Sequence, residues 1–120
     1  METKADFFTE RLIDYGVSIV RLTTKLNISS SGRIISKQLL RSGTSVGANY
    51  EEGRGAQSKA DFIHKLQIVL KEIRESLYWL KLTDRSNILN TADCDTLIDE
   101  TIELSNIIAK SILTAKNNRS

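Results

Sequence analysis

The feature that most constrains the fold is the absence of proline from all 120 residues. A globular chain ordinarily contains about 5% proline, and a proline inside a helix removes a backbone hydrogen bond and clashes with the preceding turn. Long uninterrupted helices are therefore allowed throughout the sequence. The composition, 40% hydrophobic and 27% charged, is typical of a globular protein. We expect an all-α protein with a single domain over residues 1–120, which is long enough to bury one core.

Apolar residues recur at steps of three and four in four successive segments, as in amphipathic helices. The predicted helices are, in order, Lys4 to Leu26, the serines of the Asn27–Gly32 turn to about Glu52, Ser58 to about Thr83, and about Asp93 to the C-terminal tail. Gly53 is expected to cap the end of the second helix and Thr91 the start of the fourth. Because the connections are short, successive helices should be antiparallel neighbours. This predicts an antiparallel up-down-up-down four-helix bundle.

Each predicted helix has a main apolar stripe that should face the core. The stripes are Phe8, Leu12, Tyr15, Ile19, Leu22 and Leu26; Ile35, Leu39, Val46 and Tyr50; Phe62, Leu66, Val69, Ile73, Leu77 and Leu80; and Leu97, Ile98, Ile102, Leu104, Ile108 and Ile112.

Two helices also have a second face that the core does not require. It comprises Ile13, Val17 and Val20 on the first helix and Ile68, Glu72, Glu75 and Trp79 on the third. A lone surface helix does not need a second apolar strip. We therefore expect these faces to be contacts between subunits.

The segment Leu39 to Gly55 is unusually rich in polar and small residues for a helix. Arg41, Ser45, Asn49 and Glu52 are spaced so that all four fall in one narrow stripe beside the apolar one. Buried polar groups cost about 1–3 kcal/mol each unless they are hydrogen-bonded. We expect a polar seam inside the bundle that fixes helix register, and the alternative is a helix edge that faces water.

Gly43 and Gly47 lie within the same predicted helix, one turn apart. Each glycine costs about 1 kcal/mol relative to alanine in a helix interior. Two at this spacing indicate close approach by another helix, and the alternative is a bent or frayed helix.

The net charge of +2 is small, but the charges are unevenly distributed. Basic residues dominate between Ser29 and Lys59, and acidic residues dominate between Asp93 and Lys110. Such an asymmetry could attract a polyanion, bring unlike helices of neighbouring subunits together, or reflect ordinary solvated faces. If nucleic acid binds, the candidate phosphate contacts are Arg33, Lys37, Arg54 and Lys59.

The residues required for familiar catalytic or metal sites are absent from the sequence. His64 is the sole histidine and Cys94 the sole cysteine, so neither a histidine pair nor a thiolate cluster is available for a metal. Carboxylate-bridged metal sites in bundles need a Glu-x-x-His motif on two helices, which this sequence lacks. We expect no catalytic residue, cofactor or metal, and we expect Glu72 and Glu75 to pair with an arginine such as Arg41 or Arg74.

The sequence contains no segment that suggests insertion into a membrane or export. No apolar run approaches the ~20 residues needed to span a bilayer. The N-terminus METKADFFTERL lacks the long apolar region of a signal peptide. We expect a cytoplasmic protein with no membrane partner.

The second and third predicted helices resemble a known family. The segment that carries the resemblance is LLRSGTSVGANYEEGRGAQSKADFIHKLQIVLKEIRESLYWLKL. Its specific elements are the run Arg41, Ser42, Ser45, Asn49, Glu52 and Gly53, the helix start Ser58 to Phe62, and the segment Lys71, Glu72, Glu75, Trp79 and Leu80. It is similar to the four-helix bundle proteins related to those encoded by intervening sequences in 23S ribosomal RNA genes.

This resemblance implies a small antiparallel bundle that assembles into a ring-like homopentamer and has no enzyme activity. It also implies similarity to the accessory protein of diversity-generating retroelements, in which a basic surface is associated with nucleic acid and with a reverse-transcriptase partner. The sequence therefore leads to two expectations. One is an oligomeric accessory factor that binds RNA or DNA, and the alternative is a protein-interaction or structural scaffold with no nucleic-acid role.

Overall fold

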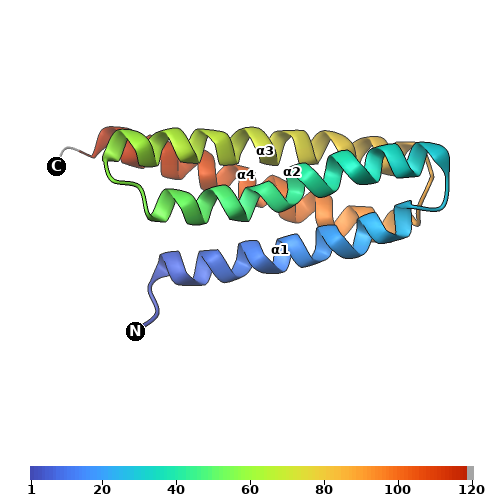
Figure 1. Ribbon diagram of the computed structural model, residues 1–120, viewed down its shortest axis with the longest axis horizontal. Helices are drawn as coiled ribbons and strands as arrows, with labels where there is room; N and C mark the ends of the chain where they lie inside the picture. Colours follow the sequence, from blue (N-terminus) through green and yellow to red (C-terminus); the bar gives the residue numbers. More distant parts are fainter. Residues whose placement is uncertain (119–120) are drawn as a thin grey trace.

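The computed structural model describes residues 1–118, which form four long α-helices and no other regular element. The helices are α1 (Lys4–Leu26), α2 (Ser30–Arg54), α3 (Lys59–Arg85) and α4 (Thr91–Asn117). They run alternately up and down, in a bundle that measures 51 × 26 × 20 Å (Figure 1). The predicted all-α class and up-down-up-down architecture are confirmed.

Side-chain caps define where the helices begin. Thr3 and Asp6 form a capping box at the start of α1, with the Asp6 amide donating to Thr3 Oγ1 at 3.1 Å and the Thr3 amide donating to Asp6 Oδ2 at 2.8 Å. Ser29 and Ser58 cap α2 and α3 in the same way, each accepting from an amide three residues later. These caps satisfy backbone donors that the first helical turn leaves unpaired.

Two of the predicted helix boundaries are wrong by one or two residues. α4 is capped by Asn90, whose Oδ1 accepts from the Ala92 amide at 3.0 Å, so that Thr91 is already helical. α2 continues through Gly53 and ends at Arg54, with Gly55 at the C-cap. Gly53 is buried instead, because a Cβ there would lie 3.1 Å from the Cβ of Lys65.

The bundle has one hydrophobic core, which is made from the predicted stripes. The buried apolar residues are Leu12, Tyr15, Ile19, Leu22, Leu26, Ile35, Leu39, Val46, Leu66, Val69, Ile73, Leu80, Leu97, Leu104, Ile108 and Ile112. The prediction was wrong for Ile102, whose side chain is 41% exposed. Thr101 takes its place in the core, because it lies four residues after Leu97 and three before Leu104 on the same face of α4, and its hydroxyl has a buried partner on α1.

Gly43 and Gly47 lie on the face of α2 that packs closely against α1. A Cβ on Gly43 would lie 2.7 Å from Cγ2 of Ile19, and one on Gly47 would lie 3.4 Å from Cβ of Leu12. The predicted close approach is confirmed, and α2 is helical through both glycines.

The four helices are not packed equally tightly. α1 packs mainly against α2 and contacts α4 less extensively. In Figure 1, the N-terminal part of α1 diverges from the other three helices. This divergence leaves side chains near the start of α1, the start of α3 and the end of α4 accessible.

Candidate interaction surfaces

An ion-pair cluster joins α2 to α3 within the segment that carries the family resemblance. Arg41 Nη1 lies 3.2 Å from Glu72 Oε2, and Arg41 Nη2 also pairs with Glu75. The indole of Trp79 donates to Glu75 Oε2 at 3.1 Å. The predicted pairing of Glu72 and Glu75 with an arginine is confirmed, and it occurs within one chain.

The electrostatics of the cluster favour its charged forms. The pKa of Glu75 is lowered, first by the hydrogen bond from Arg41 and then by that from Trp79. The pKa of Arg41 is raised, mainly by its hydrogen bond to Glu75. The Glu72 side chain is buried while Arg41 is half exposed, so the cluster holds one carboxylate inside the bundle and keeps the guanidinium at its surface.

Two hydroxyl pairs lie inside the core, and sequence reasoning missed both. Ser42 Oγ and Ser76 Oγ are 2.9 Å apart between α2 and α3, and Tyr15 Oη and Thr101 Oγ1 are 2.6 Å apart between α1 and α4. Burial raises the pKa of Tyr15 to about 12. A signal was present in the sequence, because Ser76 lies between Ile73 and Leu80 on the main apolar stripe of α3.

The predicted polar seam lies along one edge of α2 rather than inside the bundle. Ser45 Oγ donates to the Arg41 carbonyl at 2.6 Å, and Asn49 Nδ2 donates to the Ser45 carbonyl at 2.9 Å. Glu52 is exposed and pairs with Lys65 of α3 at 2.7 Å. The interior position is therefore wrong for Ser45, Asn49 and Glu52 of the single chain, because these side chains find backbone or surface partners, and the buried hydroxyls of α2 are those of Ser36 and Ser42.

The four predicted phosphate contacts do not form one surface. Arg33 and Lys37 are exposed near the start of α2, whereas Arg54 is at its end. At 1.5 Å per residue, Arg33 and Arg54 are separated by roughly 30 Å along the helix. Lys59 begins α3, at the same end of the bundle as Arg54.

Arg54 is tied to neighbouring residues and is not free for a ligand. Its guanidinium lies 2.7 Å from Asp6 Oδ1 and 3.7 Å from Glu51 Oε2, and it donates to Thr9 Oγ1 at 2.9 Å. The pKa of Asp6 is lowered by the Thr3 backbone amide and by this hydrogen bond from Arg54. Arg54 therefore fastens the start of α1 to the end of α2.

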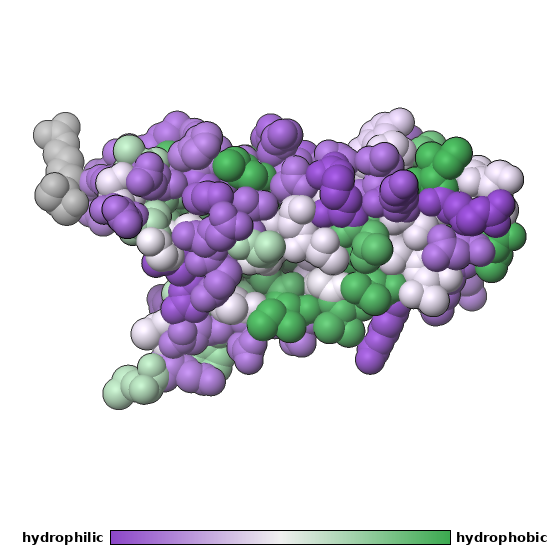
Figure 2. Space-filling model, viewed as in Figure 1, coloured by the Kyte–Doolittle hydropathy of each residue, from purple (hydrophilic) through white to green (hydrophobic). Residues whose placement is uncertain are grey.

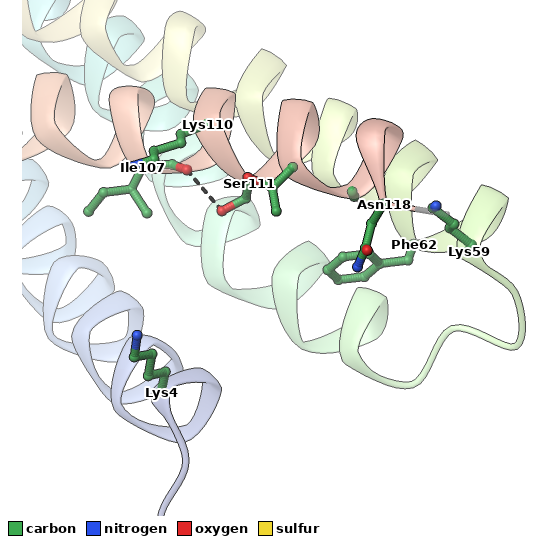
Figure 3. A pocket seen from close by; sticks show the side chains of 9 residues that line it. Lys4, Lys59, Phe62, Ile107, Lys110, Ser111 and Asn118 are labelled. Atoms are coloured by element: carbon green, nitrogen blue, oxygen red, sulfur yellow. Dashed lines mark hydrogen bonds between the residues drawn. The ribbon is translucent and has the colours of Figure 1, made fainter. Parts of the chain in front are cut away.

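Lys59 lies instead in a cleft that the sequence did not predict. Together with Lys4 of α1 and Lys110 of α4, it lines an open space of about 750 Å³ (Figure 3). These lysines come from three different helices, so only the folded chain brings them together. We call this feature the lysine cleft; its lining is Lys4, Lys59, Phe62, Ile107, Lys110, Ser111, Thr114, Ala115 and Asn118.

The second apolar face of α1 is exposed in the single chain, as its pattern suggested. Ile13, Val17 and Val20 are 54%, 41% and 47% exposed. Figure 2 shows hydrophobic residues gathered near the middle of the lower edge, where α1 lies in Figure 1. We call these three residues the α1 apolar stripe.

The proposed partner face on α3 is less open than its pattern suggested. Ile68 and Trp79 are half-buried, and Glu72 is buried. Tyr78 and Leu82 are the exposed large hydrophobic residues of α3. The exposed hydrophobic surface of this helix is therefore formed by Tyr78 and Leu82, on either side of Trp79 in the sequence, rather than by the predicted residues.

The two residue types most often used in metal sites are not gathered into a site. His64 is exposed on α3, while Cys94 is buried and its burial raises the pKa of the thiol to about 11. Within residues 1–118, no three histidine, cysteine or acidic side chains are placed to hold a metal ion. In the same range, no helix is both long enough and apolar enough to cross a membrane.

The fold and these surfaces define a small helical bundle. Its distinctive features are the ion-pair cluster between α2 and α3, the α1 apolar stripe and the lysine cleft. The family model of the 23S rRNA-intervening sequence proteins matches residues 8–110. The chain therefore belongs to the 23S rRNA-intervening sequence protein family.

A solved structure supports the same assignment. A protein of unknown function from the S23 ribosomal protein family of Bacteroides thetaiotaomicron, whose crystal structure is known, is 38% identical in sequence. The similarity covers 87% of this chain and 96% of that one, with a TM-score of 0.82. A search of curated proteins finds no match to this chain.

Proposed function

We propose that this protein is a non-enzymatic bundle that assembles with copies of itself through its exposed apolar faces. The observation that carries the proposal is the α1 apolar stripe, which lies on a helix whose other side already fills the core. Contiguous exposed apolar surface on a soluble protein marks an interaction site.

A second apolar surface supplies a complementary contact. A groove of about 390 Å³ lies between the start of α2 and the end of α3, and its lining includes Ile34, Trp79 and Leu82. Because the α1 apolar stripe and this groove are different surfaces, the stripe of one chain can contact the groove of the next in a head-to-tail arrangement. Such contacts form a closed ring when the rotation from one subunit to the next divides a full turn evenly. A pentamer is the ring that the family resemblance implies.

Sedimentation velocity on two variants tests this function. Val17→Asp places a charge in the α1 apolar stripe, and Ser18→Asp places the same charge on the adjacent, exposed position of α1. We expect wild type and Ser18→Asp to sediment as the same oligomer and Val17→Asp to sediment as a smaller species. Equal sedimentation of all three proteins would exclude the stripe as the contact.

A second candidate function is binding to a nucleic-acid backbone, and the observation that favours it is the pair Arg33 and Lys37. Both side chains are exposed on α2, and neither forms an ion pair with another residue of 1–118. A ring would repeat this pair around its axis, so weak contacts would act together through effective concentration. Binding to phosphates should weaken as the salt concentration rises.

Fluorescence anisotropy with labelled RNA, at low and moderate salt, tests this second function. Arg33→Glu combined with Lys37→Glu should abolish binding, whereas Lys71→Glu combined with Lys81→Glu, exposed lysines of α3, should leave most of it. If the two double variants bind equally, Arg33 and Lys37 are not the contact, and if wild type does not bind, nucleic-acid binding is excluded and the protein acts through protein contacts alone.

A further inference from the structure

The lysine cleft has an accessible interior at the end of the bundle where α1 begins and α4 ends. In Figure 3, Lys4 extends from α1 toward α4, and Ile107 points from α4 into the space between them. The cleft volume of about 750 Å³ lies within the range of about 300–1,000 Å³ that is usual for small-molecule sites.

The charge of the cleft is positive and uncompensated. Lys4, Lys59 and Lys110 line it, and no aspartate or glutamate does. Within the described part of the chain, none of these lysines forms an ion pair, whereas Lys25 and Lys65 both do. Negative charge on a ligand that enters this cleft would therefore favour its binding.

The walls of the cleft are apolar between these charges. Phe62, Ile107 and Ala115 are half-buried and contribute ring and aliphatic surface. The Ser111 hydroxyl already donates to the Ile107 carbonyl at 2.9 Å, so it is not free to donate to a ligand. An inorganic anion would leave the apolar walls uncovered, and a neutral hydrocarbon would leave the lysines unpaired.

We propose that the lysine cleft binds an anionic amphiphile, an unbranched alkyl chain with a carboxylate or phosphate head. The chain lies against Phe62 and Ile107, and the head lies at the positively charged rim that Lys4, Lys59 and Lys110 form around the cleft. Such a ligand matches both the charge and the apolar surface of the cleft. The site uses neither the α1 apolar stripe nor the pair Arg33 and Lys37, so it is independent of the functions proposed above.

Isothermal titration calorimetry with monomeric dodecanoate and monomeric dodecyl phosphate tests the proposal. Because a buried methylene contributes about fourfold in affinity, decanoate, which is two methylenes shorter, should bind about fifteenfold more weakly than dodecanoate. Dodecyltrimethylammonium, which has the same chain and the opposite charge, should not bind. Absence of binding by both anions, or equal binding of the cation, would overturn the proposal.

Two variants assign the binding to the cleft. Lys59→Glu combined with Lys110→Glu should weaken binding at least tenfold, whereas the control Lys37→Glu combined with Lys81→Glu, which changes net charge equally, should not. Thr114→Trp, at an exposed position of the lining, keeps every lysine and places a bulky side chain in the cleft, so it should also weaken binding. Wild-type affinity in either cleft variant would contradict the assignment.

A further titration distinguishes a free amphiphile from a lipid headgroup. Vesicles of phosphatidylglycerol present the same anionic head with the chains held in a bilayer. We expect the wild-type protein to bind monomeric dodecanoate. We expect wild type and Thr114→Trp to bind the vesicles equally. Binding to vesicles without binding to monomeric amphiphile would overturn the cleft as the site.

Discussion

The hydroxyl of Tyr15 lies 2.6 Å from that of Thr101 inside the core, and this bond joins α1 to α4. These two helices contact one another less than sequential helices do. Thr101 also donates to the Leu97 carbonyl at 2.6 Å, so the pair is anchored to the backbone of α4. Arg11 adds a second link, with hydrogen bonds of 2.9 and 2.7 Å to the two carboxylate oxygens of Glu100.

Replacement of Tyr15 by phenylalanine should lower the free energy of unfolding by about 1 kcal/mol, because the ring stays and one buried hydrogen bond is lost. Urea denaturation monitored by circular dichroism measures this difference. In a Thr101→Val background the further effect of Tyr15→Phe should be smaller, since the bond is already broken. Equal effects in both backgrounds would mean that the two hydroxyls do not stabilise one another.

The same tyrosine should make stability fall at high pH. Its pKa is about 12 in the folded chain and 10.0 without burial, so the folded state holds the proton more tightly. The stabilisation is fully present below pH 10 and is lost as the pH rises toward 12, by about 2–3 kcal/mol in total. Unfolding measured at rising pH should show a smaller decline for Tyr15→Phe than for wild type. Parallel declines would contradict the assignment to Tyr15.

Removal of the Arg41 side chain should destabilise the bundle more than removal of the Lys65 side chain, which also forms an ion pair between α2 and α3. Arg41→Ala leaves the buried carboxylate of Glu72 without its ion pair, and we expect a loss of about 1–2 kcal/mol. Lys65→Ala breaks only the pair with exposed Glu52 and should cost less than about 1 kcal/mol. Thermal denaturation at neutral pH compares them, and an equal cost for the two variants would contradict the special role of Arg41.

Two glycines should respond to alanine in opposite ways. Gly43→Ala places a Cβ 2.7 Å from Ile19, which is fully buried, so we expect a loss of about 1–3 kcal/mol from overpacking. Gly16 has nothing within 4 Å of the same position, so Gly16→Ala should gain up to about 1 kcal/mol from helix propensity. Chemical denaturation of both variants tests the close approach of α1 and α2, which would be disproved if Gly43→Ala were neutral.

The fold could be predicted from the sequence because a helix repeats every 3.6 residues and each core stripe is visible in its own segment. The error at Ile102 arises because hydrophobicity favours Ile102, although Thr101 has the core spacing from Leu97 and Leu104. The Thr101 hydroxyl is accommodated in the core by its partner Tyr15, far away in the chain. A pattern within one helix cannot reveal a partner on another.

The candidate surfaces could be predicted only where they depend on a single helix. The exposed face of Ile13, Val17 and Val20 follows from spacing within α1. The prediction that Arg33 and Arg54 share one surface was wrong, because the two residues lie at opposite ends of α2. In addition, Arg54 forms an ion pair with Asp6. The lysine cleft could not be found in this way, since it requires the relative positions of α1, α3 and α4.

The central claim, that the chain assembles with copies of itself, is tested most directly by the molar mass of the wild-type protein in solution. Size-exclusion chromatography with multi-angle light scattering, at high micromolar loading, gives this mass independently of shape. We predict a single species with a mass that is a multiple of the chain's 13.5 kDa, five times this value for a pentameric ring. A species of 13.5 kDa at every concentration would contradict it.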